Sequence, residues 1–243
     1  MSNAVIVKLN ELGYTTIPEA FYGKVNEWRM WYQGEVKGFH RYRVRNGEHI
    51  INCKRYSLGM AKKLCEDWAN LLLTEKVKIT LEGEHEQAFV DRILKENNFE
   101  VKANEMQELK SALGTVAYIP RVVGQEISED GSIVPGNAEG IVLDYVTIDN
   151  IYPLSWQNGY ISECAFASVF VRGGHTYMYL QIHHKEDNGN YAIDNRIYRY
   201  DNELLADELL TNVEGFERIP PVVHTGSPKR QFVIDRPNLA NNY

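Results

Sequence analysis

The sequence has few cysteines, and their scarcity excludes one class of protein. Cys53, Cys65 and Cys164 are the only three in 243 residues, an odd number at wide spacings. A small secreted fold held by disulfides has closely spaced cysteines in even number. We therefore expect three reduced thiols in a cytosolic protein. Cys164 precedes an apolar strand pattern, so we expect it to be buried and inert.

Long apolar runs and an excess of cations are also missing. No stretch approaches the roughly 18 uninterrupted apolar residues of a membrane-spanning helix, so we expect no membrane span. The first apolar run, residues 4–7, is too short for the core of a signal peptide. The formal net charge of −7 argues against a protein that binds nucleic acid over its whole surface. A local basic patch is compatible with this charge.

Signatures of catalysis and of cofactor binding are absent as well. The chain has no HExxH or CxxC motif, no glycine-rich phosphate loop and no GxSxG nucleophile turn. His183 and His184 are adjacent, and adjacent residues of a strand point to opposite faces, so we do not expect them to share a metal ion. We predict no catalytic residue, no metal site and no cofactor.

Residues 57–75 are predicted to form the central helix of the protein. Six apolar residues recur every three or four positions, which is typical of a helix with one apolar face: Leu58, Ala61, Leu64, Trp68, Leu71 and Leu72. Ser57 stands where an N-cap residue belongs. We expect Leu64, Trp68 and Leu71 to pack on a sheet, and we expect a strand over residues 77–81 to follow.

A second helix with an aromatic face is predicted from Thr16 to Gln33. Thr16 and Glu19 match a capping box, and Gly34 suits the C-terminal cap. The aromatic face is expected in the core. Trp31 lies partly off that face and is a candidate contact with a neighbouring subunit, since tryptophan often anchors interfaces. Further helices are expected over residues 3–12, 84–96 and 103–113.

A basic β-hairpin is predicted between these two helices. Asn46-Gly47 separates two alternating segments and is a strong hairpin signal. The first segment carries three arginines on one face: Arg41, Arg43 and Arg45. In a chain of negative net charge, a solvated or ion-paired arginine face is the favoured interpretation. The alternative is that these arginines contact a neighbouring subunit or the phosphates of DNA.

After Gly114 the composition shifts toward valine, isoleucine, tyrosine and phenylalanine, with frequent turn signals. Strands are expected over residues 115–123, 140–148, 151–156, 160–171, 175–185, 191–200 and 231–235. The three long ones from 160 to 200 are expected to form an antiparallel meander, followed by a short acidic helix over 203–210. The predicted fold class is α+β: a helical part, residues 1–113, packed on a mostly antiparallel β-rich part, residues 114–243, in one compact domain.

Four segments resemble one protein family. They are scaffold motifs spread along the chain: WRMWYQG at Trp28–Gly34, FHRY at Phe39–Tyr42, LGMAKKLCEDWANLLLTEKVKI at Leu58–Ile79, and PNLANN at Pro237–Asn242. These segments are similar to the N-terminal half of tailed-phage portal proteins, of the minor-capsid type found in siphophages and prophages of Gram-positive hosts.

The resemblance implies a structural, non-catalytic function. Portal proteins form a dodecameric ring at one capsid vertex, through which a separate terminase motor pumps DNA and on which the tail connector docks. The implied partners are further copies of the chain, terminase, capsid and tail-connector proteins, and DNA passing through the ring with little direct binding. The implied location is the virion capsid vertex, and the host cytoplasm during assembly.

The resemblance also bears on oligomeric state. Family members continue beyond the position of Tyr243 into stem, clip and crown segments that line the channel, so this chain corresponds mainly to the outer wing region. Closed rings need a repeated heterologous interface, and in portals most of it comes from those later segments. We therefore expect this chain alone to be a monomer or a weak oligomer.

The residues alone leave two other functions open. Trp156 and Tyr160 lie beside a turn and could stack on a sugar or a base in a β-rich ligand-binding module. Glu139, Asp144 and Glu163 could supply the acid and base of a hydrolase. The first function requires exposed aromatic residues gathered in a groove. The second requires two carboxyl groups that face each other across a cleft.

Overall fold

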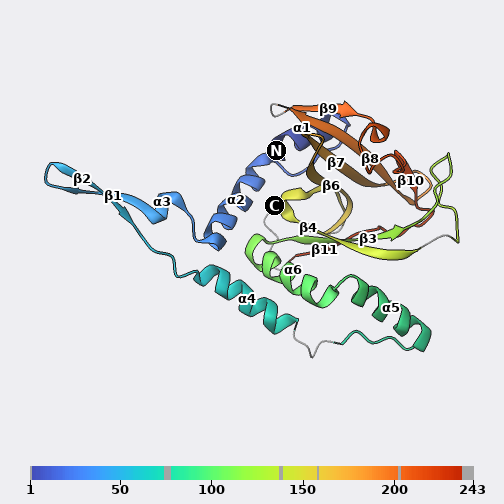
Figure 1. The fold of residues 1–243 in the computed structure, drawn as a ribbon, viewed down its shortest axis with the longest axis horizontal. Helices are drawn as coiled ribbons and strands as arrows, with labels where there is room; N and C mark the ends of the chain where they lie inside the picture. Colours follow the sequence, from blue (N-terminus) through green and yellow to red (C-terminus); the bar gives the residue numbers. More distant parts are fainter. Residues whose placement is uncertain (1, 74–77, 137–138, 158, 202–203, 237–243) are drawn as a thin grey trace.

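The chain folds as an α+β protein, with its helices concentrated before Gly114 and its large antiparallel sheets after it (Figure 1). The computed structural model describes residues 2–73, 78–136, 139–157, 159–201 and 204–236. The helices are α1 (Ser2–Glu11), α2 (Glu19–Gln33), α3 (Lys37–His40), α4 (Met60–Leu72), α5 (Glu84–Glu96) and α6 (Phe99–Leu113), with short 3-10 helices η1 (Ile148–Asn150) and η2 (Leu210–Asn212). The predicted fold class is confirmed.

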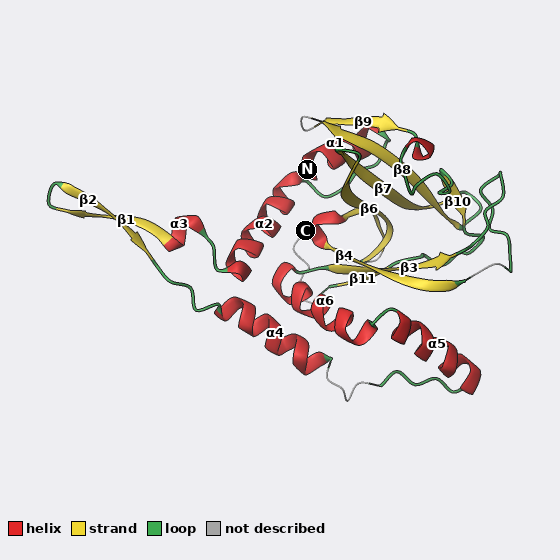
Figure 2. Ribbon diagram, in the orientation of Figure 1, coloured by secondary structure: helices red, strands yellow, loops and turns green. Residues whose placement is uncertain are grey.

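The strands form three sheets within the described residues (Figure 2). Their bounds are β1 (Arg41–Asn46), β2 (His49–Lys54), β3 (Val116–Val123), β4 (Gly140–Thr147), β5 (Ile151–Gln157), β6 (Tyr160–Arg172), β7 (His175–Lys185), β8 (Tyr191–Asp201), β9 (Leu204–Glu208), β10 (Val222–His224) and β11 (Val233–Asp235). The largest sheet has the order β10-β8-β7-β6-β5, with β9 also paired to β8. A second has the order β11-β3-β4, and β1 pairs with β2 alone. The predicted meander of β6, β7 and β8 is confirmed.

Strand β7 illustrates how the six-stranded sheet is buried on both faces. Met178, Leu180 and Ile182 are fully buried on the face that α1 and α2 cover. The residues between them point to the opposite face, because side chains alternate along a strand. There His183 packs edge-to-face on Phe232, with ring centroids 5.5 Å apart. The strand therefore contributes to two cores at once.

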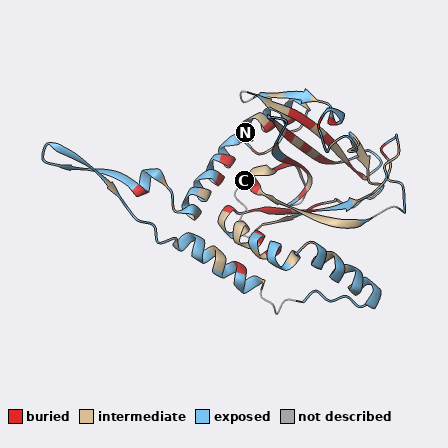
Figure 3. Cartoon of the chain, in the orientation of Figure 1, coloured by how far each residue is buried: buried red, intermediate tan, exposed pale blue. Residues whose placement is uncertain are grey.

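The second core lies between the six-stranded sheet and the three-stranded sheet. It combines buried residues of α2, α6 and both sheets, among them Val25, Leu113, Ile119, Ile151 and Phe166. Figure 3 shows that buried residues gather in the sheets and in the ends of α2 and α6 that meet them. The β1–β2 hairpin, α4 and α5 are mostly exposed in the same view.

Helix α2 begins later than predicted and ends where predicted. Pro18 is its N-cap residue without a side-chain cap hydrogen bond, and the Thr16 hydroxyl is buried without a partner, so the expected capping box is wrong. Gly34 ends the helix in the left-handed region at φ 70°, as Gly C-caps do. A Cβ at Gly34 would lie 2.5 Å from the Ser57 hydroxyl oxygen, so the chain before α4 passes close to the end of α2.

The start of the central helix also differs from the prediction. Helix α4 begins at Met60 after Gly59, which has φ 65°. Ser57 is therefore not the N-cap residue. Its hydroxyl instead accepts a hydrogen bond from the Gly59 backbone N–H at 3.1 Å, within the link that precedes the helix. The predicted last turn, residues 74–75, lies outside the described residues.

The predicted packing of this helix on a sheet is wrong. Helix α4 lies against α6 and near α2, and its inward face is small, with Ala69 fully buried and Cys65 half-buried. Trp68 is 52% exposed, and Leu64 and Leu71 are exposed too. Small residues allow two helices to approach closely, so the small face of α4 meets α6 and its large apolar side chains point outward.

Two further segments differ from their predicted structure. Residues 78–81 do not form a strand, and Val77 lies outside the described residues. Residues 204–208 form strand β9 instead of an acidic helix. They pair with the edge of β8, where Leu205 lies opposite Tyr200, and this tertiary pairing overrides the helical pattern of the local sequence.

The two aromatic residues Phe232 and Trp68 should respond very differently to substitution. Phe232 is buried between the Phe166 and His183 rings, so Phe232→Ala should lower the free energy of unfolding by about 3–5 kcal/mol. Trp68→Ala removes an exposed side chain and should change it by about 0.5 kcal/mol or less. Urea unfolding at low protein concentration measures both. Similar losses for the two variants would contradict the outward orientation of α4.

Candidate assembly interface

A hairpin projects away from the rest of the molecule (Figure 1). It consists of α3, β1 and β2, and we call residues 37–55 the arm. Asn46 pairs with His49 as the last rung, so the turn residues are Gly47 and Glu48. Gly47 has φ 62°, and a glycine in the first central position suits a type II′ turn. The predicted hairpin is confirmed, although Asn46 belongs to the strand and not to the turn.

The arm has a basic face and an apolar face, because residues directly opposite each other in an antiparallel pair share a face. The predicted arginines lie on one face together with Lys54 and Asn52: Arg41 opposite Lys54, Arg43 opposite Asn52, and Arg45 opposite Ile50. The other face pairs Tyr42 with Cys53 and Val44 with Ile51. All six residues of β1 are exposed, and so are five of the six in β2.

The base of the arm is a stack of aromatic rings and one guanidinium group. Trp31, at the end of α2, packs on Phe39 with ring centroids 5.2 Å apart. The Arg55 guanidinium carbon lies 4.8 Å from the Phe39 ring centroid and 4.4 Å from that of Tyr42. Arg55 also donates a hydrogen bond to the Phe39 carbonyl oxygen at 3.0 Å. The structure thus places Trp31 at the root of the arm, and the residue is 41% exposed.

Helix α4, which follows the arm in the chain, presents an apolar stripe. Four large residues on one side of the helix are exposed, and we call them the α4 stripe: Met60, Leu64, Trp68 and Leu71. The opposite side holds the helix in place, where the Asn104 amide donates to the Asn70 side-chain oxygen at 3.2 Å. Burial, with the charges of Glu108 and Glu66, raises the pKa of the Cys65 thiol on that side, so it remains protonated. The stripe and the arm's apolar face are therefore two uncovered apolar surfaces among the described residues.

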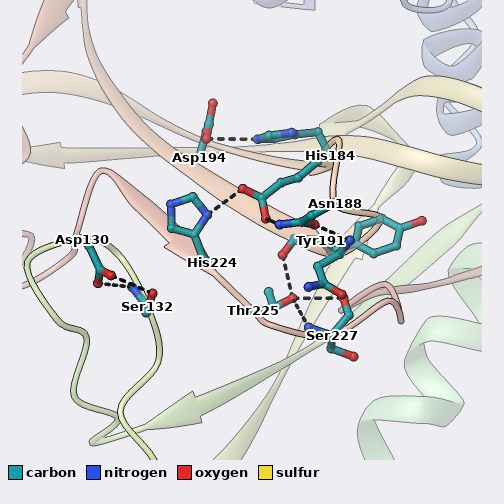
Figure 4. Close-up of polar contacts among 11 residues, drawn as sticks. Asp130, Ser132, His184, Asn188, Tyr191, Asp194, His224, Thr225 and Ser227 are labelled. Carbon is teal, nitrogen blue, oxygen red and sulfur yellow. Dashed lines mark hydrogen bonds and ion pairs between the residues drawn. The ribbon is translucent and has the colours of Figure 1, made fainter.

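A polar hollow of about 490 Å³ is a second candidate site. Its wall includes Glu186, Asn188 and His224, and the His224 Nδ1 lies 2.7 Å from a Glu186 carboxylate oxygen. Figure 4 shows that the neighbouring polar groups point at one another: Asp130 accepts from Ser132, and the Thr225 hydroxyl donates to the Tyr191 carbonyl oxygen at 2.6 Å. These contacts join β10 to neighbouring turns and strands, so the network serves the fold.

His184 and Asp194 form an ion pair next to this hollow. The His184 Nε2 lies 3.2 Å from a carboxylate oxygen of Asp194 (Figure 4). The hydrogen bond with Asp194 raises the pKa of His184 above its usual value against a smaller effect of partial burial. Burial alone would raise the pKa of Asp194, but the hydrogen bond and charge of His184, with Arg196, outweigh it and lower that pKa. Each partner therefore favours the charged form of the other.

The structure separates the other residues singled out in the sequence. His183 is 1% exposed, and burial lowers its pKa to about 3, so it is a neutral core side chain. Asp144 pairs with Arg121 at 3.1 Å, and Glu163 accepts the Lys185 backbone N–H at 2.8 Å in a different sheet. In the described part of the chain, no three His, Cys, Asp or Glu residues gather as a metal site would require.

Trp156 and Tyr160 do not form a joint stacking surface. Both are exposed, as expected beside the turn between β5 and β6. The register pairs Trp156 with Ile161 and Gln157 with Tyr160, which puts the two aromatic residues on opposite faces of the strand pair. Cys164 is fully buried, as predicted, and burial raises its thiol pKa, which favours the protonated form over the reactive thiolate.

Apolar surfaces that a chain leaves uncovered are typical of subunits of larger assemblies. The comparison with known families agrees with this class. The family model described as phage portal protein, SPP1 Gp6-like, matches residues 14–221. That range is well over half of the chain, and the chain therefore belongs to this family of phage portal proteins. No individual curated protein matches it. No helix in the described residues is both long enough and apolar enough to cross a bilayer.

Sequence reasoning selected part of this candidate interface and did not select another part. It selected Trp31 and the three arginines, and the structure places all four on the arm or at its root. It missed Phe39 and Arg55, which are 16 residues apart and meet only when the hairpin closes. The available signal was the FHRY segment followed by Arg55 at the end of the return strand.

Arg55 should hold the arm in its observed conformation. Removal of one cation–π contact at an exposed site costs about 0.5–1 kcal/mol, and Arg55 contacts two rings. We expect Arg55→Ala to speed amide hydrogen exchange in residues 41–54 about tenfold while the melting temperature of the body stays the same. Arg43→Ala, on the exposed basic face, is the matched control. Equal exchange in both variants would show that the stack does not hold the arm.

The His184–Asp194 pair should make stability depend on pH in a defined window. Unfolded histidine titrates near about 6.5 and unfolded aspartate near about 3.9. The raised pKa of His184 stabilises the fold below about pH 6.5, and this contribution is lost as the pH rises through the folded pKa. The lowered pKa of Asp194 stabilises it above about pH 3.9, and this contribution is lost as the pH falls through the folded pKa.

His184→Gln should therefore destabilise the protein most between about pH 4 and pH 6.5, by a few tenths to about 1 kcal/mol, because the pair is partly exposed. The loss should shrink at about pH 8.5. Thermal unfolding across this range measures it. His85→Gln, at an exposed position of α5, is the control. If His184→Gln loses more stability at higher pH, the pKa of His184 is not raised by folding and the prediction is wrong.

Proposed function

We propose that this chain is a structural, non-catalytic component of a phage portal, the ring at one capsid vertex that serves DNA packaging, ejection and tail attachment. The observation that carries the proposal is the family match over residues 14–221. The exposed arm and α4 stripe support it, since subunits of a ring need surfaces that their own chain does not cover.

The proposal extends to partners and location. The partners are further copies of the chain in a dodecameric ring, together with terminase, capsid and tail-connector proteins, and the DNA that passes through. The protein acts at the capsid vertex of the virion and assembles in the host cytoplasm. Within the subunit, we propose that residues 1–113 and 114–243 work as one wing-like domain. The support is the packing of α1 and α2 on the six-stranded sheet.

Trp31, Arg41, Arg43 and Arg45 are proposed contacts with a neighbouring subunit or with DNA. All three arginines are exposed, and this supports a role in binding a neighbouring subunit or DNA. A DNA role would appear as duplex binding that weakens steeply with salt and is lost on substitution of the arginines. Fluorescence anisotropy with a labelled duplex at two salt concentrations distinguishes the two kinds of partner.

The portal role predicts one position in the phage particle. A peptide tag fits the Gly173-Gly174 turn, where both residues are exposed and an added side chain meets open space. Gold-labelled antibody should mark one vertex per capsid, at the tail. Particles with a tag on the major capsid protein should be labelled all over and serve as the control. Label along the tail, or no label on purified particles, would refute the proposal.

A further inference from the structure

We propose that the apolar face of the arm of one copy docks on the α4 stripe of the next copy. The apolar face consists of Tyr42, Val44, Ile51 and Cys53, and the stripe consists of Met60, Leu64, Trp68 and Leu71. The inference rests on the proposed portal function in one respect: it takes the partner to be a second copy of this chain. It adds which two surfaces of the copies meet.

The arm needs a partner for physical reasons. An isolated two-stranded hairpin is marginally stable in water, because neither face is covered. Val44 and Ile51, a cross-strand pair, are 42% and 46% exposed, and the arm meets the rest of the described chain only at its base. β-Branched residues facing solvent at the centre of a projecting hairpin gain stability only when another surface covers them.

The α4 stripe is also an apolar surface that its own chain leaves uncovered. Its four side chains are between 52% and 73% exposed, although they form the most apolar side of the helix. Contiguous exposed apolar patches of this kind mark interaction sites. The inward side of α4 is already occupied by α6, so the helix cannot turn its stripe inward without breaking the contact around Ala69.

The two surfaces match in length and chemistry. Each six-residue strand of the arm is about 20 Å long at roughly 3.3 Å per residue. Helix α4, with 13 residues, is also about 20 Å long at roughly 1.5 Å per residue. The apolar face of the ribbon is therefore long enough to lie along the stripe. Arg41, Arg43 and Arg45, on the opposite face, stay in water, and Arg55 remains at the root of the arm on the Tyr42 ring.

Charge favours a second copy as the partner. The segment 41–55 holds five of the 26 Lys and Arg residues and one of the 33 Asp and Glu residues. The rest of the chain therefore has 21 cations against 32 carboxylates, so a basic arm meets an acidic body in every copy. Such complementarity speeds encounter and discriminates among partners.

The arm cannot dock on the stripe of its own chain in the observed arrangement. The arm and α4 leave a common root near Gly34 and Ser57 and diverge from it (Figure 1). Docking is therefore between copies, and because two different surfaces meet, the contact is head-to-tail and can repeat around a ring. Stable interfaces usually bury at least about 1,200 Å² of surface in total. A ribbon about 20 Å long and two strands wide buries less, so one contact gives weak association.

Sedimentation equilibrium of the 243-residue chain tests the proposal. The wild type should self-associate with rising concentration, up to about 1 mM. Val44→Asp in the arm and Leu64→Asp in the stripe should each weaken association at least tenfold. Asn52→Ser, an uncharged change on the other face of the arm, and Lys63→Ser, beside the stripe, are matched controls that should change it less than threefold. Unchanged circular dichroism spectra establish that each variant is folded.

A mixture of the two variants gives the sharpest result. Val44→Asp keeps an intact stripe and Leu64→Asp keeps an intact arm, so together they should form a 1:1 dimer and nothing larger. The proposal is overturned by a wild type that stays monomeric, by a mixture that stays monomeric, or by association that neither variant weakens. Loss of duplex DNA binding in Arg43→Ser, with association untouched in Val44→Asp, would overturn it and assign the arm to DNA.

These outcomes are independent of the portal role itself. Self-association that ignores both variants removes the arm–stripe contact but leaves labelling at the tail vertex as the test of the portal. If the vertex label is absent while arm and stripe still dock, the portal function is refuted and the arm–stripe contact stands.

Discussion

The burial of both faces of the six-stranded sheet determines where everything else in the molecule can go. Helices α1 and α2 occupy one face, and the C-terminal segment and three-stranded sheet occupy the other. The outer side of the three-stranded sheet is in turn covered by α6, whose Gln107 and Lys110 side chains bind Asp235 of β11. Helix α4 lies against α6 and not against either of these two sheets. It packs on a helix through small residues, and its large side chains remain outside.

The sequence predicted most of the fold because most of it follows from local periodicity. The hairpin, α5 and the meander strands appear within a few residues of their expected bounds, since alternation and turn residues specify them locally. The orientation of α4 could not be predicted in this way. Its pattern identifies which residues share a face, but whether that face meets a sheet or solvent depends on surfaces formed by distant segments. The prediction of a helix over residues 203–210 was wrong for a related reason. Residues 204–208 form a strand because they pair with β8, which is not evident from their own sequence.

The candidate interface was predictable in its charges and not in its architecture. Trp31 and the arginines stand out by type and spacing. The cation–π stack at the root depends on hairpin closure, which brings Arg55 over Phe39 and Tyr42. The adjacent histidines show the same limit. Alternation predicts that His183 and His184 face opposite ways, but only the packed structure makes one a neutral core residue between phenylalanine rings and the other half of an ion pair.

The close approach of Gly34 to Ser57 has a consequence for how this family can vary. The chain leaves the body at Gly34 and returns to it at Ser57, so its two crossing points lie almost in contact. The segment between them therefore starts and ends at the same place, and most of it projects away from the rest of the molecule. Loops closed at such a point can be lengthened, shortened or exchanged at little cost to the rest of the fold. The reach of the subunit can thus evolve separately from the stability of its body.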